Sequence, residues 1–350
     1  MAIEEYNEAP LISVVIPIYN GAEKVKTCLQ YLDEQTIVYP FEVLLIDDAS
    51  PDGSGIKLVS QIQELKNNQR FRVILCKENG RAGAARNRGV AEARGEYIVF
   101  IDQDDYPSKD MLEVLYNLLE NGKHDCSACN VVDKSGAEYK RFPCKQLTDL
   151  SLQKKEEIMS CFGYVFAIMI KKQILIENNL FFPEKVMFED VLFTYGLLAC
   201  INSINTTEKA LYNRADDENS QTAFISKSKM VDRIKATELY LERYKENPAI
   251  IPYLPMINQF AFYYIFLSNT WWMMTQKELY DRNLLNECSI KGHALKIHWR
   301  DVFRTQSYFG INRMRILKVV YDHPWTTKSI IPAFHIIKPI FSIMKKTIKH

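Results

Sequence analysis

The sequence of 350 residues lacks a surplus of charge of either sign. It has 44 Lys and Arg against 43 Asp and Glu, which gives a formal net charge of +1. A dedicated nucleic-acid-binding protein carries a basic excess, so this balance argues against nucleic acid as a partner. Hydrophobic residues make up 47% and charged residues 25% of the chain, which is typical of an ordinary globular protein.

A disulfide framework and a secretory start are also missing. The eight cysteines are scattered along the chain, and residues 1–10 are acidic and polar. We therefore expect free thiols in a reducing, cytoplasmic compartment. Cys126 and Cys129 form a single CxxC with no second pair, and we interpret them as two residues of a strand rather than a metal or redox site.

No Gly/Ser-rich linker, internal repeat or low-complexity block divides the chain, although its length is enough for two packed units. The first third alternates short apolar runs with amphipathic stretches. The expected buried strands are Ile12–Ile18, 43–46 with Phe41 just before it, 71–76 and 97–101. The expected helices are about 22–35, 55–66, 82–93 and 109–119. This alternation predicts an α/β fold with a mostly parallel sheet covered on both faces, whose ligands bind at the carboxyl ends of the strands.

The chain becomes continuously helical from about Ser226, so we place a domain boundary near Ala223. Residues 249–275 contain no charge and are long enough to span a membrane, but prolines and amides interrupt them. A buried helix is therefore favoured over a membrane span.

The last segment, 328–350, has the pattern of a basic amphipathic helix. Its apolar residues at helical spacing are Phe334, Ile337, Phe341, Met344 and Ile348, and its lysines on other faces are Lys338, Lys345, Lys346 and Lys349. Such a helix can lie in a membrane interface with its lysines on anionic headgroups. It can equally pack on the protein with a solvated lysine face.

Acidic side chains collect directly after two of the expected strands. Asp47 and Asp48 follow the second strand and can accept hydrogen bonds from a base or from ribose hydroxyls. Asp102, Asp104 and Asp105 follow the fourth strand, and three carboxylates so close together repel one another unless a cation joins them. Mg²⁺ or Mn²⁺, which prefer oxygen ligands and bridge phosphates, would fit. The alternative for both loops is a solvated turn rich in turn-forming residues.

Three further features complete the candidate site. Residues 80–89 carry three arginines at a helix start but no GxGxxG, so a dinucleotide fingerprint is absent. Arg81 there is suited to neutralise phosphate or hold the acidic loops. Glu189 and Asp190 precede an amphipathic helix, where one carboxylate can act as a general base or simply favour the helix N-terminus. Arg214 follows a strand-like run and can close over a diphosphate.

These pieces, in this order and spacing, resemble glycosyltransferase family 2, whose members have the GT-A fold, a Rossmann-like mixed, mostly parallel sheet flanked by helices. The resemblance covers about residues 12–220. The motifs that carry it are SVVIPIYN (13–20), DDASPDG (47–53), AARNRG (84–89), GEYIVFIDQDD (95–105), FED (188–190) and YNR (212–214).

The resemblance implies a donor site in the first half of the chain. Pro17 and Tyr19 are expected to line the nucleotide pocket, with Tyr19 near the base. Asp48 is expected to bind the base, Asp47 to support that loop, and Arg81 to lie near the base and phosphates.

The resemblance also implies a metal-dependent reaction centre. Asp104 matches the direct ligand of Mn²⁺ or Mg²⁺, and Asp102 belongs to the same DxD pair, nearer the ribose or donor sugar. Asp190 matches the catalytic base, Glu189 beside it would bind acceptor or sugar, and Arg214 matches a position that touches the diphosphate. The family usually has a small residue between the two DxD aspartates, from which Gln103 departs mildly.

The implied activity is an inverting transfer of a sugar from a nucleotide-sugar, most commonly a UDP-sugar, to a hydroxyl acceptor in cell-surface polysaccharide biosynthesis. A saccharide or lipid-linked saccharide would be the acceptor, with peripheral contact to the inner face of the cell membrane through 330–350. The implied domains are a GT-A catalytic domain over 1–223 (donor side about 11–121, acceptor side about 122–223), a helical region over 224–327 and the basic tail over 328–350.

Three other functions are compatible with parts of the pattern. The main alternative is a catalytically silent nucleotide-sugar-binding or scaffold subunit of a polysaccharide assembly complex, and the intact set of Asp102, Asp104 and Asp190 argues against it. The missing GxGxxG argues against a dinucleotide-dependent oxidoreductase. A nucleotidyltransferase would need a glycine-rich basic loop after the first strand, where this chain has Tyr19 and Asn20.

Overall fold

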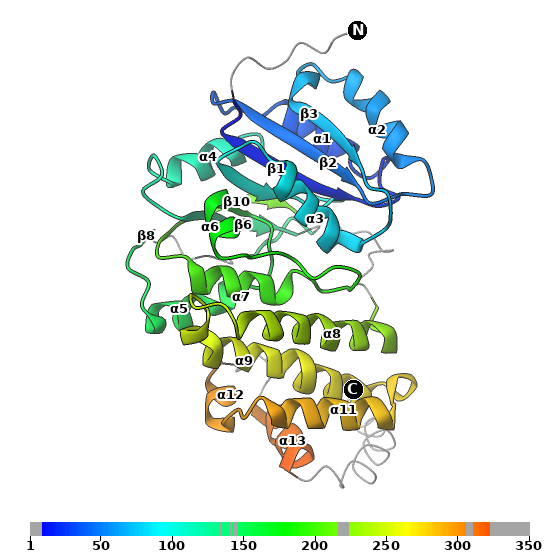
Figure 1. Cartoon of the computed structure of the whole chain (residues 1–350), viewed down its shortest axis with the longest axis vertical. Coiled ribbons are helices and arrows are strands. Elements are labelled where there is room, and N and C mark those ends of the chain that lie inside the picture. Colours follow the sequence, from blue (N-terminus) through cyan, green and yellow to red (C-terminus); the bar gives the residue numbers. More distant parts are fainter. Residues whose placement is uncertain are drawn as a thin grey trace, which may run out of the picture. The chain divides into compact units, whose positions relative to one another are not determined.

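The computed structural model describes residues 9–133, 135–139, 142, 146–215, 224–305 and 311–322. The chain divides into two compact units (Figure 1). The first comprises Met1–Ala223 with Glu246–Ile251, and the second Phe224–Lys245 with Pro252–His350. The basic tail expected over 328–350 lies outside the described residues and stays a prediction.

The first unit is built on one ten-stranded sheet with the order β3-β2-β1-β4-β9-β6-β10-β5, to which β7 and β8 add at β6 and β10. The strands are β1 (Ile12–Ile18), β2 (Phe41–Asp47), β3 (Phe71–Leu75), β4 (Tyr97–Phe100), β5 (Tyr106–Pro107), β6 (Cys126–Val132), β7 (Glu138–Tyr139), β8 (Gln146–Leu147), β9 (Ile168–Lys171) and β10 (Ile204–Asn213). The four strands from β3 to β4 run parallel, and β9 is antiparallel to both β4 and β6. The sheet is therefore mixed and mostly parallel, as predicted.

The helices of this unit follow the predicted alternation with strands. They are α1 (Lys26–Asp33), α2 (Ser54–Gln63), α3 (Arg81–Glu92), α4 (Met111–Leu118), α5 (Leu152–Ile158), α6 (Lys172–Glu177) and α7 (Val191–Cys200). The first begins four residues later than expected, because the backbone N–H groups of Lys24 and Val25 both bond to the carbonyl of Gly21 and form a turn. Tyr19, Asn20 and Lys24, which lie before or within this turn, line a pocket.

Helices cover both faces of the sheet. Alternate residues of β1, from Ile12 to Ile18, share one hydrophobic core with α1, α2 and α4, as the two-residue period of a strand requires. On the opposite face α3 lies so close to β1 that a Cβ at Gly89 would be 2.2 Å from Val15 Cγ1. The side chain of Phe193 in α7 also reaches this face, where its ring contacts that of Phe100 in β4.

Cys126 and Cys129 lie in β6 with buried side chains, and the cysteines in the described part of the chain are free thiols. The interpretation of this CxxC as two strand residues is confirmed.

The second unit is helical throughout its described residues. Its helices are α8 (Lys227–Tyr244), α9 (Leu254–Phe262), a π-helical turn (Tyr263–Leu267), α10 (Ser268–Thr275), α11 (Arg282–Ala294), α12 (Trp299–Thr305) and α13 (Ile311–Asp322). The uncharged segment expected as a helix forms α9, the π-turn and α10, with Phe262, Phe266 and Met273 buried in the core of this unit. Within the described ranges, no helix has both the length and the apolar character needed to cross a membrane.

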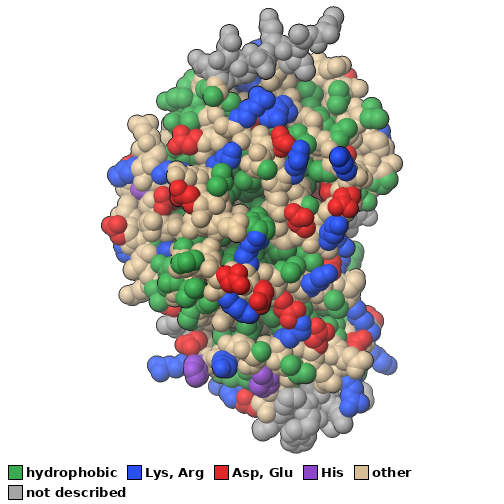
Figure 2. Space-filling model, viewed as in Figure 1, with side chains coloured by type: hydrophobic (Ala, Val, Ile, Leu, Met, Phe, Trp, Pro, Cys, Tyr) green, Lys and Arg blue, Asp and Glu red, His purple; other side chains and the backbone are tan. Residues whose placement is uncertain are grey.

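The surface reflects the balanced charge of the sequence. Figure 2 shows acidic and basic side chains interspersed over the face in view. A field of one sign that would attract a polyanion is not visible on this face.

Candidate active site

A pocket of about 650 Å³ lies in the first unit at the carboxyl ends of β1, β2 and β4. This is the edge at which ligands bind in parallel α/β sheets, and the volume suits a small-molecule ligand. Its lining residues are Pro17, Ile18, Tyr19, Asn20, Lys24, Asp48, Asn79, Arg81, Ala82, Arg86, Asp102, Gln103, Asp104, Asp105, Val186, Met187, Phe188, Glu189, Asp190, Arg214 and Ala215.

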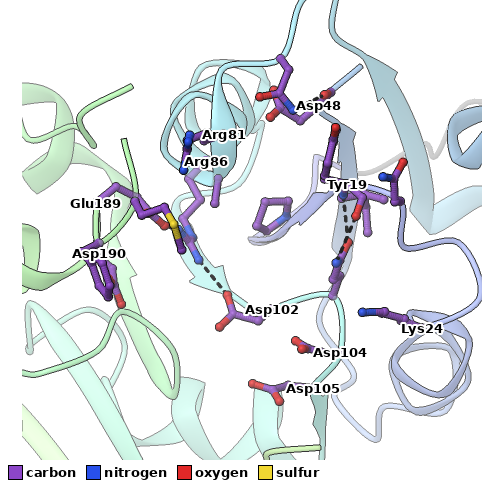
Figure 3. A pocket seen from close by; sticks show the side chains of 18 of the residues that line it. Tyr19, Lys24, Asp48, Arg81, Arg86, Asp102, Asp104, Asp105, Glu189 and Asp190 are labelled. Atoms are coloured by element: carbon purple, nitrogen blue, oxygen red, sulfur yellow. Dashed lines mark hydrogen bonds and ion pairs between the residues drawn. The ribbon is translucent and has the colours of Figure 1, made fainter. Parts of the chain in front are cut away.

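Nearly all of the residues predicted from the sequence lie in this pocket. They are Pro17, Tyr19, Asp48, Arg81, Asp102, Asp104, Glu189, Asp190 and Arg214. Figure 3 shows Glu189 and Asp190 on one side of the space and Asp48, Tyr19 and Lys24 on other sides of it. Asp47 does not line the pocket: it is 5% exposed, and its Oδ2 accepts a hydrogen bond from the backbone N–H of Ser50 at 3.3 Å. The structure thus places Asp47 behind the loop.

The carboxylate of Asp48 has one oxygen bound and one available. Oδ1 accepts a hydrogen bond from the backbone N–H of Gly80 at 2.9 Å. Oδ2 is buried and, within the described part of the chain, has no hydrogen-bond partner. Burial raises the pKa of Asp48, and the backbone N–H groups of Gly80 and Arg81 oppose that rise. A buried acceptor without a donor is costly, so this oxygen is suited to receive an N–H from a ligand.

Gln103 fastens the loop after β1 to the acidic loop after β4. Its Oε1 accepts from the backbone N–H of Tyr19 at 2.9 Å, and its Nε2 donates to the carbonyl of Tyr19 at 3.3 Å. A Cβ at Gly21 would come within 2.0 Å of Gln103 Oε1, so the contact needs glycine there. The residue that departs from the family pattern thus has a structural role.

Asp105 ties the acidic loop to the end of β10. Its Oδ2 accepts from the Tyr212 hydroxyl at 2.7 Å, and its Oδ1 accepts from the backbone N–H of Ala215 at 3.0 Å. The same hydroxyl accepts from the backbone N–H of Asp102 at 3.1 Å. Burial, followed by the charge of Asp102, raises the pKa of Asp105. These bonds hold Arg214 at the pocket wall, with its guanidinium 5.7 Å from the centre of the Phe166 ring.

Arg86 joins the two acidic parts of the pocket. Its guanidinium donates to Asp102 Oδ1 at 2.7 Å and forms an ion pair with Glu189. The arginine is 4% and the glutamate 8% exposed. Buried charges need such partners, so Arg86 permits Asp102 and Glu189 to face the same space.

Helix α3 also holds the backbone of the segment that leads to Glu189. The amide of Asn87 exchanges two hydrogen bonds, both at 2.8 Å, with the backbone of Phe182. The carbonyl of Gly80 accepts from the backbone N–H of Lys185 at 2.8 Å. A Cβ at Gly83 would lie 2.1 Å from the carbonyl oxygen of Pro183, so glycine permits this close approach.

Asp190 is the residue directly before α7. Burial, with a contribution from the charge of Glu189, raises the pKa of Asp190 to about 7, while Arg86 opposes the rise. A carboxyl whose pKa lies near neutrality is suited to accept a proton at physiological pH.

The loops around the pocket carry unusual backbone conformations. Asn20, Ala49, Arg81 and Phe188 all have φ between 50° and 65°. Left-handed conformations at non-glycine residues cost roughly 1–3 kcal/mol each and concentrate at functional sites. Three of these residues, Asn20, Arg81 and Phe188, line the pocket, so the packing of the unit stabilises loop shapes that the local sequence disfavours.

Among the lining residues that the sequence analysis did not identify as site residues are Lys24, Arg86 and Gln103. Figure 3 shows the amino group of Lys24 directed toward the space that Asp104 faces. Arg86 belongs to the quoted AARNRG motif, but nothing local distinguishes it from Arg88, which is exposed and pairs with Glu92 one turn away. Only the position of each side chain on the folded helix separates the two.

Comparison with known proteins finds a family model that matches part of the chain. Residues 13–183 match the model of glycosyl transferase family 2. An uncharacterized glycosyltransferase of Bacillus subtilis, EpsJ, is 29% identical over 237 residues, which are 65% of this chain and 67% of that protein. A cholesterol galactosyltransferase of Borreliella burgdorferi is 26% identical over 356 aligned positions, covering 91% and 93% of the two chains.

The fold has a counterpart among solved structures. S. aureus TarS in complex with UDP-GlcNAc superposes with a TM-score of 0.65 at 19% identity, over 89% of this chain and 90% of that one. A likeness of this extent cannot be confined to the sheet unit, so it also includes helical segments of the second unit. Residues 13–183 of this glycosyltransferase thus match glycosyltransferase family 2, and the chain has the GT-A fold with a helical C-terminal region.

Proposed function

We propose that this enzyme transfers a sugar from a UDP-sugar to a saccharide hydroxyl, with inversion at the anomeric carbon. The observation that carries the proposal is one pocket in which the acidic loops after β2 and β4 meet the Glu189–Asp190 pair. The complexes of S. aureus TarS with UDP-GlcNAc and with UDP support the choice of nucleotide, because that protein shares the fold.

The nucleoside would lie between the loops after β1 and β2. Asp48 Oδ2, the buried acceptor without a partner, would receive the imide N–H of uracil. Tyr19, fixed by Gln103, would lie near the base, and Arg81, Lys24 and Arg214 would face the diphosphate.

A divalent cation fits the donor set of this pocket. Among the described residues, no group of three His, Cys, Asp or Glu side chains forms a ready metal site. Mg²⁺ and Mn²⁺ sites on nucleotides, however, use one or two carboxylates and complete their shell with phosphate oxygens and water. Asp104 and Asp102, which share the pocket wall, supply such a pair. The bound metal would neutralise charge on the departing diphosphate.

The protein's own groups would carry out the proton transfer. Asp190 would accept the proton of the attacking acceptor hydroxyl, which its raised pKa favours at neutral pH. Glu189, held by Arg86, would bind a hydroxyl of the acceptor or of the donor sugar. An attack on the face opposite the leaving diphosphate needs no covalent intermediate and inverts the anomeric centre.

For the acceptor we propose a saccharide of the bacterial cell surface, attached to a lipid carrier. The supporting relatives include an amylovoran biosynthesis glycosyltransferase of Erwinia amylovora, 31% identical over 170 residues, and the poly(ribitol-phosphate) N-acetylglucosaminyltransferase TarP of Staphylococcus aureus, 30% identical over 207 residues. Such an acceptor would place the enzyme at the cytoplasmic face of the membrane, with the segment 330–350 as a peripheral contact.

The donor assignment is tested by thermal stabilisation with UDP, GDP, CDP and NAD, with and without Mn²⁺. A ligand that binds only the folded state raises the melting temperature. We expect UDP with Mn²⁺ to stabilise the native chain most strongly and Asp104→Ala to lose the contribution of the metal. Asp110→Ala is the matched control. It removes the same charge from a residue six positions after Asp104, and the side chain of Asp110 does not line the pocket.

The outcomes separate the proposal from its alternative. If no nucleoside diphosphate shifts the melting temperature under any metal condition, the donor-site assignment is wrong and a silent scaffold subunit becomes the better description. If GDP or CDP stabilises more strongly than UDP, the pocket assignment stands but uridine is wrong.

A further inference from the structure

Three stacked aromatic rings lead from the acidic loop to the protein surface. The Phe166 ring lies 4.7 Å from that of Tyr212 at an interplanar angle of 13°, and the Tyr164 ring lies 5.1 Å from that of Phe166 at 16°. Exposure increases along this column, from 0% at Tyr212 through 5% at Phe166 to 41% at Tyr164. Its inner end touches the reaction centre, because the Tyr212 hydroxyl bonds to Asp105 and to the backbone of Asp102.

The segment that leads to the exposed end of the column contacts the helix that the proposed catalytic base precedes. The chain runs from Tyr164 into β9, which is antiparallel to β4 and so enters the sheet at the edge where β4 ends and the acidic loop begins. Two residues before Tyr164, the carbonyl of Phe162 accepts from the Thr194 hydroxyl at 2.7 Å. Thr194 lies one turn into α7, the helix that Asp190 precedes.

The side chain of Arg214 connects the pocket with this aromatic column. The guanidinium of Arg214, which lines the pocket, lies over the Phe166 ring on which Tyr164 stacks. Tyr164 itself is not part of the pocket lining. A portion of the substrate that extends out of the pocket past Arg214 would therefore meet Tyr164.

We propose that Tyr164 forms an acceptor subsite that binds a pyranose ring by stacking. This proposal deepens the proposed function and rests on it. One face of a pyranose presents C–H groups of slight positive charge, which match the negative face of an aromatic ring. A tyrosine has few rotatable bonds, and stacking on Phe166 orients this ring before the sugar arrives, so little conformational entropy is lost on binding.

A saccharide is the occupant that the surroundings favour. The pocket beside which the column runs is lined by Arg214, Asp190 and Glu189, which would bind hydroxyls or take a proton from one. A purely apolar partner would leave these groups without hydrogen bonds, whereas a sugar offers both an apolar face and hydroxyls.

The test measures binding of methyl β-D-glucopyranoside by ligand-observed NMR, with D-glucitol as its open-chain counterpart. Both are measured with and without UDP and Mn²⁺ on the full chain and on Tyr164→Ala, Tyr164→Leu and Tyr164→Trp. Tyr39→Ala is the matched control: Tyr39 is 43% exposed and contacts another ring, that of Tyr116 at 4.7 Å, but it precedes β2 at the opposite edge of the sheet.

We expect the pyranoside to bind the native chain, Tyr39→Ala and Tyr164→Trp alike. The dissociation constant should rise about tenfold in Tyr164→Ala and Tyr164→Leu, as loss of one aromatic stack implies. The leucine variant keeps apolar volume without a ring and therefore reports on stacking even if the alanine variant folds poorly. Glucitol should bind at least about tenfold more weakly than the pyranoside.

Unchanged affinity in Tyr164→Leu, equal binding of glucitol, or no pyranoside binding by the native chain would each overturn the subsite. UDP binding is read separately by thermal shift. A chain that binds the pyranoside through Tyr164 but no nucleotide would keep this subsite and lose the proposed function. A chain that binds UDP but no pyranoside would keep the proposed function and lose this subsite.

Discussion

At the scale of single residues, the organisation of the site depends on a buried arginine. Arg86 contacts Asp102 after β4 and Glu189 before α7, two carboxylates that belong to loops far apart in the sequence. Glu189 is buried and Asp102 is half-buried, so a positive partner must compensate for the solvation that these carboxylates lose on folding. One guanidinium with several donors can satisfy both at fixed geometry, which a lysine ammonium cannot do as well.

Replacing Arg86 should therefore destabilise the protein more than the loss of an ordinary surface charge. For Arg86→Met we expect a loss of about 3–5 kcal/mol in the free energy of unfolding, because Glu189 is left as a buried charge without its partner. Urea denaturation of the full chain measures this loss. Arg88→Met is the control on the same helix: its side chain is 55% exposed and pairs with Glu92, so about 1 kcal/mol or less is expected. Equal losses in the two variants would contradict the role of Arg86.

The pKa of Asp190 predicts how activity depends on pH. Burial raises this pKa to about 7 in the free protein, and only the ionised carboxylate can accept a proton. We therefore expect kcat/KM to be constant above about pH 8 and to fall tenfold per pH unit well below 7, because the fraction of ionised Asp190 falls in that way. Initial rates of sugar transfer across this range measure it.

Asp190→Asn supplies the control for that pH profile. It should lower turnover by about 10²–10⁴ and abolish the acidic limb, while the melting-temperature shift with UDP and Mn²⁺ should persist. An unchanged pH profile in the variant would assign the limb to another group.

At the scale of elements, α3 acts as a spacer between the sheet and the segment that carries Glu189 and Asp190. Gly89 lets the helix approach Val15 of β1, and Gly83 lets it approach the carbonyl of Pro183. The amide of Asn87 fixes Phe182 in the same register. The helix thereby sets the separation between the acidic loop and the proposed base.

This role predicts a reversal of the usual effect of alanine in a helix. Glycine to alanine commonly stabilises a helix by up to about 1 kcal/mol. We expect Gly83→Ala to destabilise the protein instead and to lower transfer activity, because the new Cβ would sit 2.1 Å from the carbonyl oxygen of Pro183. Denaturation and initial rates measure both effects.

The exposed Ala91 in the same helix gives the comparison. Ala91→Gly should cost about 1 kcal/mol of stability through helix propensity alone and should leave the rate per folded molecule unchanged. A stabilised and fully active Gly83→Ala variant would show that α3 and residues 183–189 separate freely.

At the scale of the whole molecule, charge is balanced along the chain but not evenly placed. The chain has a net charge of +1, but four of its lysines lie close together near the C-terminal end. They are Lys338, Lys345, Lys346 and Lys349. Basic residues near an anionic membrane contribute about 1 kcal/mol each at low ionic strength. We therefore expect any attraction to an anionic membrane to act through the last segment.

The membrane hypothesis for the tail therefore makes a salt-dependent prediction. The full chain should co-sediment with vesicles containing anionic lipid, and less so at high salt. A chain ending at residue 329 should lose this binding and keep its stabilisation by UDP with Mn²⁺. Undiminished vesicle binding by the shortened chain would rule out the tail as the anchor.

The sequence by itself determined the first four strands, their order along the chain and the edge at which the site lies. Ile12–Ile18 has its predicted bounds because a short run of almost entirely apolar residues, most of them β-branched, favours a buried strand. Acidic side chains placed after β2 and β4 had to meet, since parallel strands end at one edge. The antiparallel insertion of β9 between β4 and β6 was not predictable, because pairing between distant strands leaves no periodic signal.

Only the tertiary structure decided which side chains act together. Arg86 is 16 residues from Asp102 and 103 from Glu189, and its neighbour Arg88 has the same chemistry. The column from Tyr212 to Tyr164 joins two segments whose local sequences contain aromatic residues but do not indicate that the rings stack. Local sequence fixes backbone conformation and the period of burial. Contacts across the sheet depend on which face each side chain occupies once the whole unit has packed.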